Sequence, residues 1–276
     1  MKYMLKSCIQ WGSCILSALV LNGTSAQTVH IAHCLAGCPT GAPAANEIVV
    51  RHLFAASINY ETGLADWIAY RVLPGTVGVA SLLPRVWQPD ELLAQSTLEG
   101  IDSAPGFLQP DLSDQQDSAY RVNEIIINPE DRGRLVPMSS FAGTPYWEDL
   151  NFLSNMAPIP GDLRIGPWSR LDQAINELAA REGDVFIVSG PLYGDAIARN
   201  GDGETGNGPT AFFKFIATAT SHTAFVFPYG VAQHGSYCEQ LTSAIALEER
   251  SGLRFLPERS DLDAPDLHKL LGCSDN

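Results

Sequence analysis

Several features that mark common protein classes are missing from this chain of 276 residues. No apolar run reaches the roughly 18–20 residues of a membrane-spanning helix, which excludes an integral membrane protein. No fixed-period repeat or heptad pattern is present, which excludes solenoids and coiled coils. The chain also has no glycine loop of the Walker or Rossmann type, and Ser139-Ser140 lacks the Gly-x-Ser-x-Gly context of a serine hydrolase.

Positive charge is scarce as well. The chain has 17 Lys+Arg residues against 31 Asp+Glu residues, a net charge of −14. All the acidic residues follow residue 26, whereas Lys2 and Lys6 precede it, so residues 27–276 carry 15 basic and 31 acidic residues, or −16. Such a chain does not attract polyanions through its overall field, and any contact with nucleic acid requires a local basic surface.

Residues 1–26 have the three-part order of an export signal. Lys2 and Lys6 give a positive start, Cys14–Leu21 is apolar, and the small residues Thr24–Ala26 offer a cleavage site. The alternative is a short buried helix. The pattern predicts an exported protein, periplasmic or secreted, that is cut after Ala26 and keeps residues 27–276 as a single domain.

The cysteines fit an exported protein. Loss of the leader removes Cys8 and Cys14 and leaves an even number, which favours disulfides in an oxidising compartment. The short segment Cys34-Leu35-Ala36-Gly37-Cys38 could close a small loop, which would leave Cys238 to bind the C-terminal tail through Cys273. A zinc site formed by the same four residues is the alternative, but no paired CxxC spacing supports it.

Strand-like runs are frequent and bounded by Gly, Pro, Asn or Asp. They lie at residues 48–50, 67–72, 124–127, 185–188, 211–216 and 224–227. Helical spacing of apolar residues predicts one clear helix at 167–181 and a second near 247–250 that ends at Gly252. Because strands and helices are mixed rather than strictly alternating, the fold class is α+β, with a central, mostly antiparallel sheet flanked by helices.

Four consecutive segments carry a family resemblance: Asp131–Pro137, Ser140–Thr144, Asn151–Pro158 and Leu163–Trp168. Their order resembles that of the DNA/RNA non-specific endonucleases, a family that includes secreted bacterial nucleases and endonuclease G. Similar segments extend the resemblance over nearly all of the chain after the leader, at residues 34–41, 66–71, 188–191, 209–214 and 249–253. The resemblance implies a ββα metal-finger active site that hydrolyses DNA and RNA, with Mg²⁺ as the expected cofactor.

The chain departs from the family pattern at the residues that perform the chemistry. Arg134 stands where the family has its general-base histidine, and Arg164 stands where it has its metal-binding asparagine. Asp172 stands at the position of a glutamate that holds a metal-bound water, and Ile159 at that of a glutamine, whereas the phosphate-binding Arg132 is kept. A guanidinium is not a base near neutral pH and has no lone pair for Mg²⁺, so binding of the metal is doubtful here.

These substitutions favour an anion site formed by Arg132, Arg134, Arg164 and Arg85, because arginine binds phosphate and carboxylate through paired hydrogen bonds. The alternative is that Arg134 and Arg164 pair with carboxylates and fill an inactive site. The six histidines lie outside the motif segments, at His30, His33, His52, His222, His234 and His268. Three interpretations therefore stay open: an impaired nuclease that still contacts DNA or RNA, an active nuclease with a rearranged site, and a scaffold for an unidentified protein partner.

Overall fold

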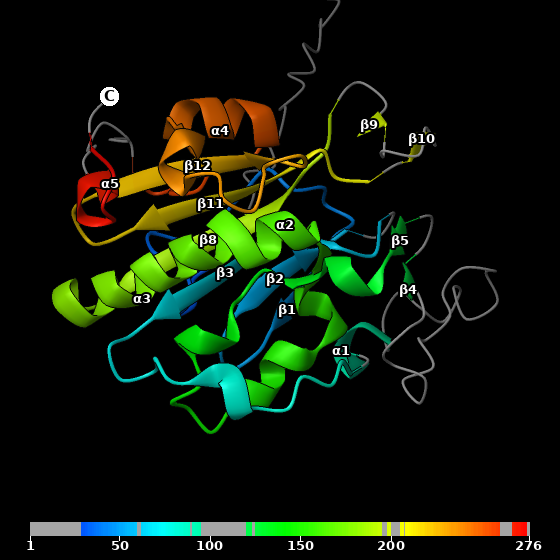
Figure 1. Cartoon of the computed structure of the whole chain (residues 1–276), viewed down its shortest axis with the longest axis horizontal. Coiled ribbons are helices and arrows are strands. Elements are labelled where there is room, and N and C mark those ends of the chain that lie inside the picture. The colour runs from blue at the N-terminus through cyan, green and yellow to red at the C-terminus, as the bar shows by residue number, and fades with distance from the viewer. Residues whose placement is uncertain are drawn as a thin grey trace, which may run out of the picture.

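A computed structural model gives the fold (Figure 1). It describes residues 29–59, 62–88, 90–94, 120–122, 125–194, 198–199, 205–206, 208–259 and 267–274. The predicted leader at residues 1–26 lies outside the described residues. In the part that is described, no helix is long and apolar enough to cross a membrane.

The centre of the molecule is a seven-stranded sheet in which every neighbouring pair of strands is antiparallel. Its order is β1-β2-β3-β8-β11-β12-β13. The strands are β1 (Glu47–Val50), β2 (Ala55–Ile58), β3 (Ala65–Val72), β8 (Val185–Leu192), β11 (Ala211–Ala217), β12 (His222–Pro228) and β13 (Leu241–Thr242). The predicted α+β class and antiparallel sheet are therefore confirmed.

Short strand pairs lie outside this sheet. They are β4 (Tyr120–Val122) with β5 (Ile125–Ile127), β6 (Arg132–Arg134) with β7 (Met156–Pro158), and β9 (Ala198–Arg199) with β10 (Thr205–Gly206). The helices are α1 (Glu91–Ala94), α2 (Gly161–Leu163), α3 (Ser169–Glu182), α4 (Ala244–Ser251) and α5 (Leu267–Leu270).

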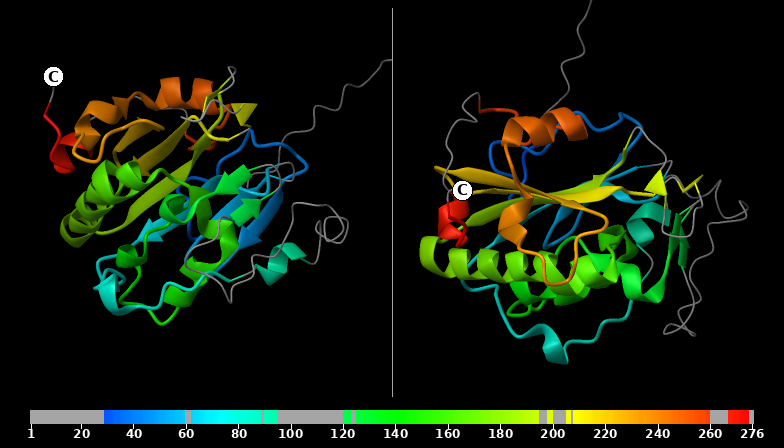
Figure 2. Two further views of the ribbon diagram at one scale, coloured as in Figure 1. Left: turned by 45° about the vertical axis from the view of Figure 1, so that its right-hand side comes forward. Right: turned by 45° about the horizontal axis from the view of Figure 1, so that its top comes forward.

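Two apolar layers cover the two faces of the large sheet. On one face, Leu171, Ile175 and Leu178 of α3 pack with Phe212 and Phe225. On the other face, α4 contributes apolar side chains to a second cluster that also holds the N-terminal segment. The right-hand view of Figure 2 shows α3 and α4 on opposite sides of the sheet. Burial on both faces explains why the central strands are apolar at nearly every position.

The predicted second helix is longer than its apolar pattern suggested. α4 begins after Ser243, which is its N-cap. The Ser243 hydroxyl accepts a hydrogen bond from the backbone N–H of Ala246, with 3.0 Å between the two heavy atoms. It ends as expected at Gly252, which is left-handed with φ of 70°. Strand β2 was missed because its four residues, Ala-Ala-Ser-Ile, are too short and too small to give a strand signal.

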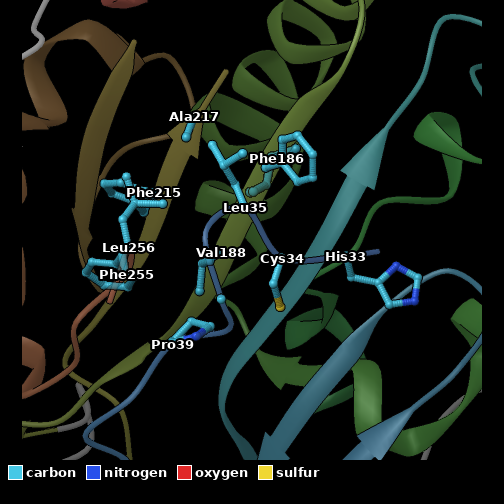
Figure 3. A pocket seen from close by; sticks show the side chains of 12 residues that line it. His33, Cys34, Leu35, Pro39, Phe186, Val188, Phe215, Ala217, Phe255 and Leu256 are labelled. Atoms are coloured by element: carbon cyan, nitrogen blue, oxygen red, sulfur yellow. The ribbon is translucent and has the colours of Figure 1, made fainter. Parts of the chain in front are cut away.

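Both predicted disulfides form, Cys34–Cys38 and Cys238–Cys273, so the zinc alternative is wrong. The first closes a loop over the sheet face that α4 also covers. Figure 3 shows Leu35 and Cys34 of this segment beside Val188 and Phe215 of the sheet, around a cavity of about 10 Å³. That volume holds at most one water molecule, so this cavity is not a ligand site.

Candidate functional site

Three of the segments that carry the family resemblance, which contain β6, β7 and the turn before α3, form one ββα unit. Strands β6 and β7 pair antiparallel, with Arg132 opposite Pro158 and Arg134 opposite Met156. The chain then passes through α2 and a kinked turn, Arg164–Trp168, into α3. The kink is at Gly166, whose backbone is not helical, so the predicted helix starts at Ser169 rather than at Pro167.

The guanidinium of Arg134 is held in place by three neighbours. Its Nε donates to the carbonyl of Leu150 at 3.1 Å, and its Nη2 donates to Oδ1 of Asn151 at 2.6 Å. The guanidinium carbon also lies 4.1 Å from the ring centroid of Trp87, a cation–π contact. Arg134 is therefore a fixed hydrogen-bond donor on β6, and among the described residues it has no carboxylate ion-pair partner.

Arg164 is held by the segment just before β6. Its Nε and Nη2 donate to the carbonyl of Glu130 at 3.2 and 2.8 Å. The neighbouring Asp131 accepts the amide hydrogen of Gly161 at 3.0 Å, which joins the start of β6 to the start of α2. The predicted alternative, in which Arg134 and Arg164 pair with carboxylates, is not what the fold forms: among the described residues neither arginine has a carboxylate oxygen within ion-pair distance.

The positive charge of Arg85 acts on both of these arginines. Burial first, and then the charges of Arg85 and Arg164, lower the pKa of Arg134 to about 10. Burial also lowers the pKa of Arg164, with Arg85 acting in the same direction and Asp131 opposing it. Arg134 stays protonated at neutral pH and cannot accept a proton from water. Three like charges thus act on one another, and we call Arg85, Arg134 and Arg164 the arginine cluster.

Arg132 differs from the cluster in its surroundings. It lies two residues before Arg134 on β6, so the two side chains leave the strand on the same side. It is buried, with 9% of its surface exposed. The sequence predicts Arg132 as an anion-binding residue. Because Arg132 is buried, it is a weaker candidate for contact with an anion than the exposed Arg85.

Asp172 points into the core rather than toward the cluster. Its carboxylate forms an ion pair with the ammonium of Lys214 on β11, and the two side chains are 7% and 0% exposed. The Lys214 Nζ also lies 4.1 Å from the ring centroid of Trp168 and 3.5 Å from the Tyr70 hydroxyl oxygen. Burial raises the pKa of Asp172, and the charge of Lys214 opposes that shift. The Asp172 carboxylate is thus already ion-paired with a buried lysine.

These side chains do not fit a divalent cation. Mg²⁺ prefers oxygen ligands, whereas the Arg164 side chain has only hydrogen-bond donors. The Asp172 carboxylate already forms an ion pair with Lys214. Across the described ranges, no group of three or more His, Cys, Asp or Glu side chains could hold a metal ion.

Two residues that fix the site were not found from the sequence. Trp87 lies far from the motif in the chain, and only the tertiary fold brings it onto Arg134. Asn151 was visible as part of a family segment, but its role was not: it accepts from Arg134 and donates to the carbonyl of Pro84 at 3.2 Å. Asn151 therefore ties the segment that carries Arg85 to the ββα unit.

The loop after β12 borders the site. A Cβ atom added at Gly166 would lie 2.4 Å from the carbonyl oxygen of Gln233, so this loop packs directly against the kink. Arg170 donates to the carbonyls of Gln233 at 3.1 Å and Gly235 at 2.5 Å. His234 lies between these two anchors and is exposed. It is the histidine that the fold fixes to the kink before α3.

Several known proteins are similar to this chain in sequence or in architecture. The model of the DNA/RNA non-specific endonuclease family matches residues 36–262. A nuclease of Serratia marcescens is 32% identical over 239 residues, which cover 83% of this chain and 82% of that nuclease. A nuclease of Nostoc sp. is 26% identical over 165 residues, 58% of this chain and 53% of the relative. The crystal structure of endonuclease G in complex with the inhibitor EndoGI has a TM-score of 0.57 at 17% identity, covering 79% of this chain and 89% of that one.

Proposed function

The chain belongs to the DNA/RNA non-specific endonuclease family, and we propose that it is an exported member that binds nucleic-acid phosphates through the arginine cluster but hydrolyses phosphodiesters weakly or not at all. The observation that carries this proposal is the state of Arg134 and Arg164. Both stand where the family chemistry needs a lone pair, and both guanidinium groups donate hydrogen bonds to fixed carbonyl or amide oxygens.

The charge balance around the cluster supports an anion as its ligand. Three cations elsewhere in the described fold, Arg51, Arg71 and Lys214, each pair with a carboxylate. Within the described ranges no carboxylate lies within ion-pair distance of Arg85, Arg134 or Arg164, although Asp131 acts on Arg164 from further away and the chain has almost twice as many acidic as basic residues. Like charges gathered in a partly buried site are costly, and a bound phosphate relieves that cost through charge-assisted hydrogen bonds.

Export rests on separate observations. The order of charge, apolar run and small residues in positions 1–26 is typical of a leader, and structural disulfides are typical of oxidising compartments and rare in reducing ones. Detection of the full-length chain alone in a whole-cell fraction, with no shorter form in the periplasm or medium, would contradict this part of the proposal.

The catalytic part is tested by digestion of plasmid DNA and of RNA with Mg²⁺ or Mn²⁺. The native chain is compared with an Arg134→His/Arg164→Asn double variant. We expect no cleavage by the native chain and measurable cleavage by the variant. Rapid metal-dependent cleavage by the native chain would show that impairment is wrong and that another base acts.

Binding is tested separately by fluorescence anisotropy with a labelled single-stranded oligonucleotide over a series of salt concentrations. Loss of one phosphate contact should reduce the slope of log K against log salt by about 0.7, the value for one charge on a single strand. We expect this change in Arg85→Ala. Arg250→Ala is the matched control, because Arg250 is an exposed arginine on α4, which packs on the other face of the sheet. Equal slopes in both variants would contradict the cluster as the phosphate site.

A rearranged active site is the second candidate. It is favoured by His234, an exposed imidazole in the loop that packs against the kink before α3. If His234 acts as the base, His234→Ala should abolish any cleavage by the native chain while leaving oligonucleotide binding unchanged.

A protein-binding scaffold is the third candidate. The segment before Trp87 exposes three apolar side chains, with exposed fractions of 78% for Val79, 90% for Leu82 and 45% for Val86. Exposed apolar side chains gathered in one segment are typical of interaction surfaces. A partner bound there should tolerate high salt, whereas nucleic acid bound at the cluster should be released by it.

A further inference from the structure

One exposed aromatic pair stands apart from the buried ring contacts of the core. The rings of His52 and Tyr146 are stacked, with centroids 4.3 Å apart and planes within 7°. The His52 side chain is 63% exposed and Tyr146 is 48% exposed. Every other ring pair found within the described ranges includes at least one buried ring.

The imidazole of the stacked pair is held by a carboxylate although it faces solvent. Oδ2 of Asp149 lies 3.0 Å from both the backbone nitrogen and Nδ1 of His52. The carboxylate therefore fixes the turn between β1 and β2 and orients the imidazole at the same time. A flat aromatic surface that is already ordered loses little conformational entropy when a further ring stacks on it.

The anchors of this pair and of Arg134 belong to one turn. Asp149, which holds His52, lies in the 3₁₀ turn Trp147–Asn151, whose last two residues hold Arg134. The rise of a 3₁₀ helix is about 2 Å per residue, so the anchors at Asp149 and Asn151 are about 4 Å apart along the turn. His52 of the aromatic pair and Arg134 of the arginine cluster are thus bonded to neighbouring residues of the same turn.

We propose that His52 and Tyr146 form a stacking platform for an unpaired base of a single-stranded nucleic acid. This inference rests on the proposed function, because the phosphates of the same strand contact the arginine cluster. Every base has a π-face, so stacking binds single strands with little sequence preference. Bases inside a duplex are already stacked and paired, so the platform selects single strands over double strands.

The test uses two labelled probes of twelve nucleotides with the same number of phosphates: an oligo-dA and an abasic strand. Kd is measured by anisotropy for the native chain, Tyr146→Ala and Tyr146→Phe. We expect Tyr146→Ala to bind oligo-dA about 5- to 30-fold more weakly, at the lower end of the range for loss of one stacked base. It should bind the abasic strand as the native chain does. Tyr146→Phe, which keeps the ring, should match the native chain on both probes.

The control for lost apolar surface is Ile245→Ala, since Ile245 is 53% exposed on α4. Oligo-dA binding that is equal in the native chain and Tyr146→Ala, but weakened in Arg85→Ala, would overturn the platform and leave the proposed function standing. A loss by Tyr146→Ala that is equal on both probes would also overturn it, because the abasic strand has no base to stack. Failure of the native chain to bind either probe would overturn the proposed function and the platform together.

Discussion

The buried pair of Asp172 and Lys214 gives the sharpest prediction about this fold. In Asp172→Asn the ammonium of Lys214, which is fully buried, loses its counter-ion. Removing one partner of a buried ion pair costs about 3–5 kcal/mol of unfolding free energy. A domain of this kind has about 5–15 kcal/mol in total, so the variant should lose a large fraction of its stability.

The companion variant removes both charges. In Asp172→Leu/Lys214→Met no uncompensated charge remains, and such replacements are often neutral or stabilising. The double variant should therefore be at least about 2 kcal/mol more stable than Asp172→Asn. Asp162→Asn, which changes an exposed acid near the same unit, is the control and should stay within about 0.5 kcal/mol of the native chain.

Urea unfolding with intact disulfides measures these differences by linear extrapolation. If Asp172→Asn costs less than about 1 kcal/mol, Asp172 is not the counter-ion of Lys214 and our assignment of this carboxylate to the core is refuted. The same assay bears on function. Asp172→Glu introduces the residue that the family resemblance predicts at this position, but it adds a methylene to a packed site, which costs about 1–3 kcal/mol. Reactivation should therefore be attempted at Arg134 and Arg164 alone.

Three further predictions concern stability and binding. Gly133→Ala should destabilise the chain by about 1–3 kcal/mol, because the new methyl would lie 2.6 Å from the Ile159 Cβ, and Ile159→Ala in the same chain should recover part of that loss in urea unfolding. Removing the disulfide Cys238–Cys273, with a sequence separation of 35, should cost about 4 kcal/mol, against about 2 kcal/mol for Cys34–Cys38, with a separation of 4, if loop entropy dominates; reversed costs in the same assay would contradict that model. Burial raises the pKa of Asp131, so it takes up a proton earlier than an ordinary aspartate as the pH falls. Protonation removes a negative charge beside the arginine cluster, so the net charge of the site becomes more positive. The affinity for sulfate, measured by calorimetry, should therefore rise as the pH drops from about 7 toward 4, with a weaker pH dependence in Asp131→Asn.

Local sequence determined a large part of this protein. Apolar strand runs separated by Gly, Pro and Asn fixed the central antiparallel strands, because burial on both faces leaves a continuous apolar pattern. The even number of cysteines, with one close pair, allowed both disulfides to be predicted. The sequence also limited the chemistry of Arg134 and Arg164, since a guanidinium side chain is neither a base near neutral pH nor a metal ligand.

Tertiary structure decided what those side chains do. The partner of Asp172 comes from β11, 42 residues further along the chain, so no local pattern could distinguish a core carboxylate from a metal-site carboxylate. The contact of Arg134 with Trp87, and the stacking of His52 on Tyr146, likewise join segments that are distant in sequence. Residue type limits the chemistry available to a position, whereas burial and the identity of its neighbours select which part of that chemistry is used, and these depend on the packing of the whole chain.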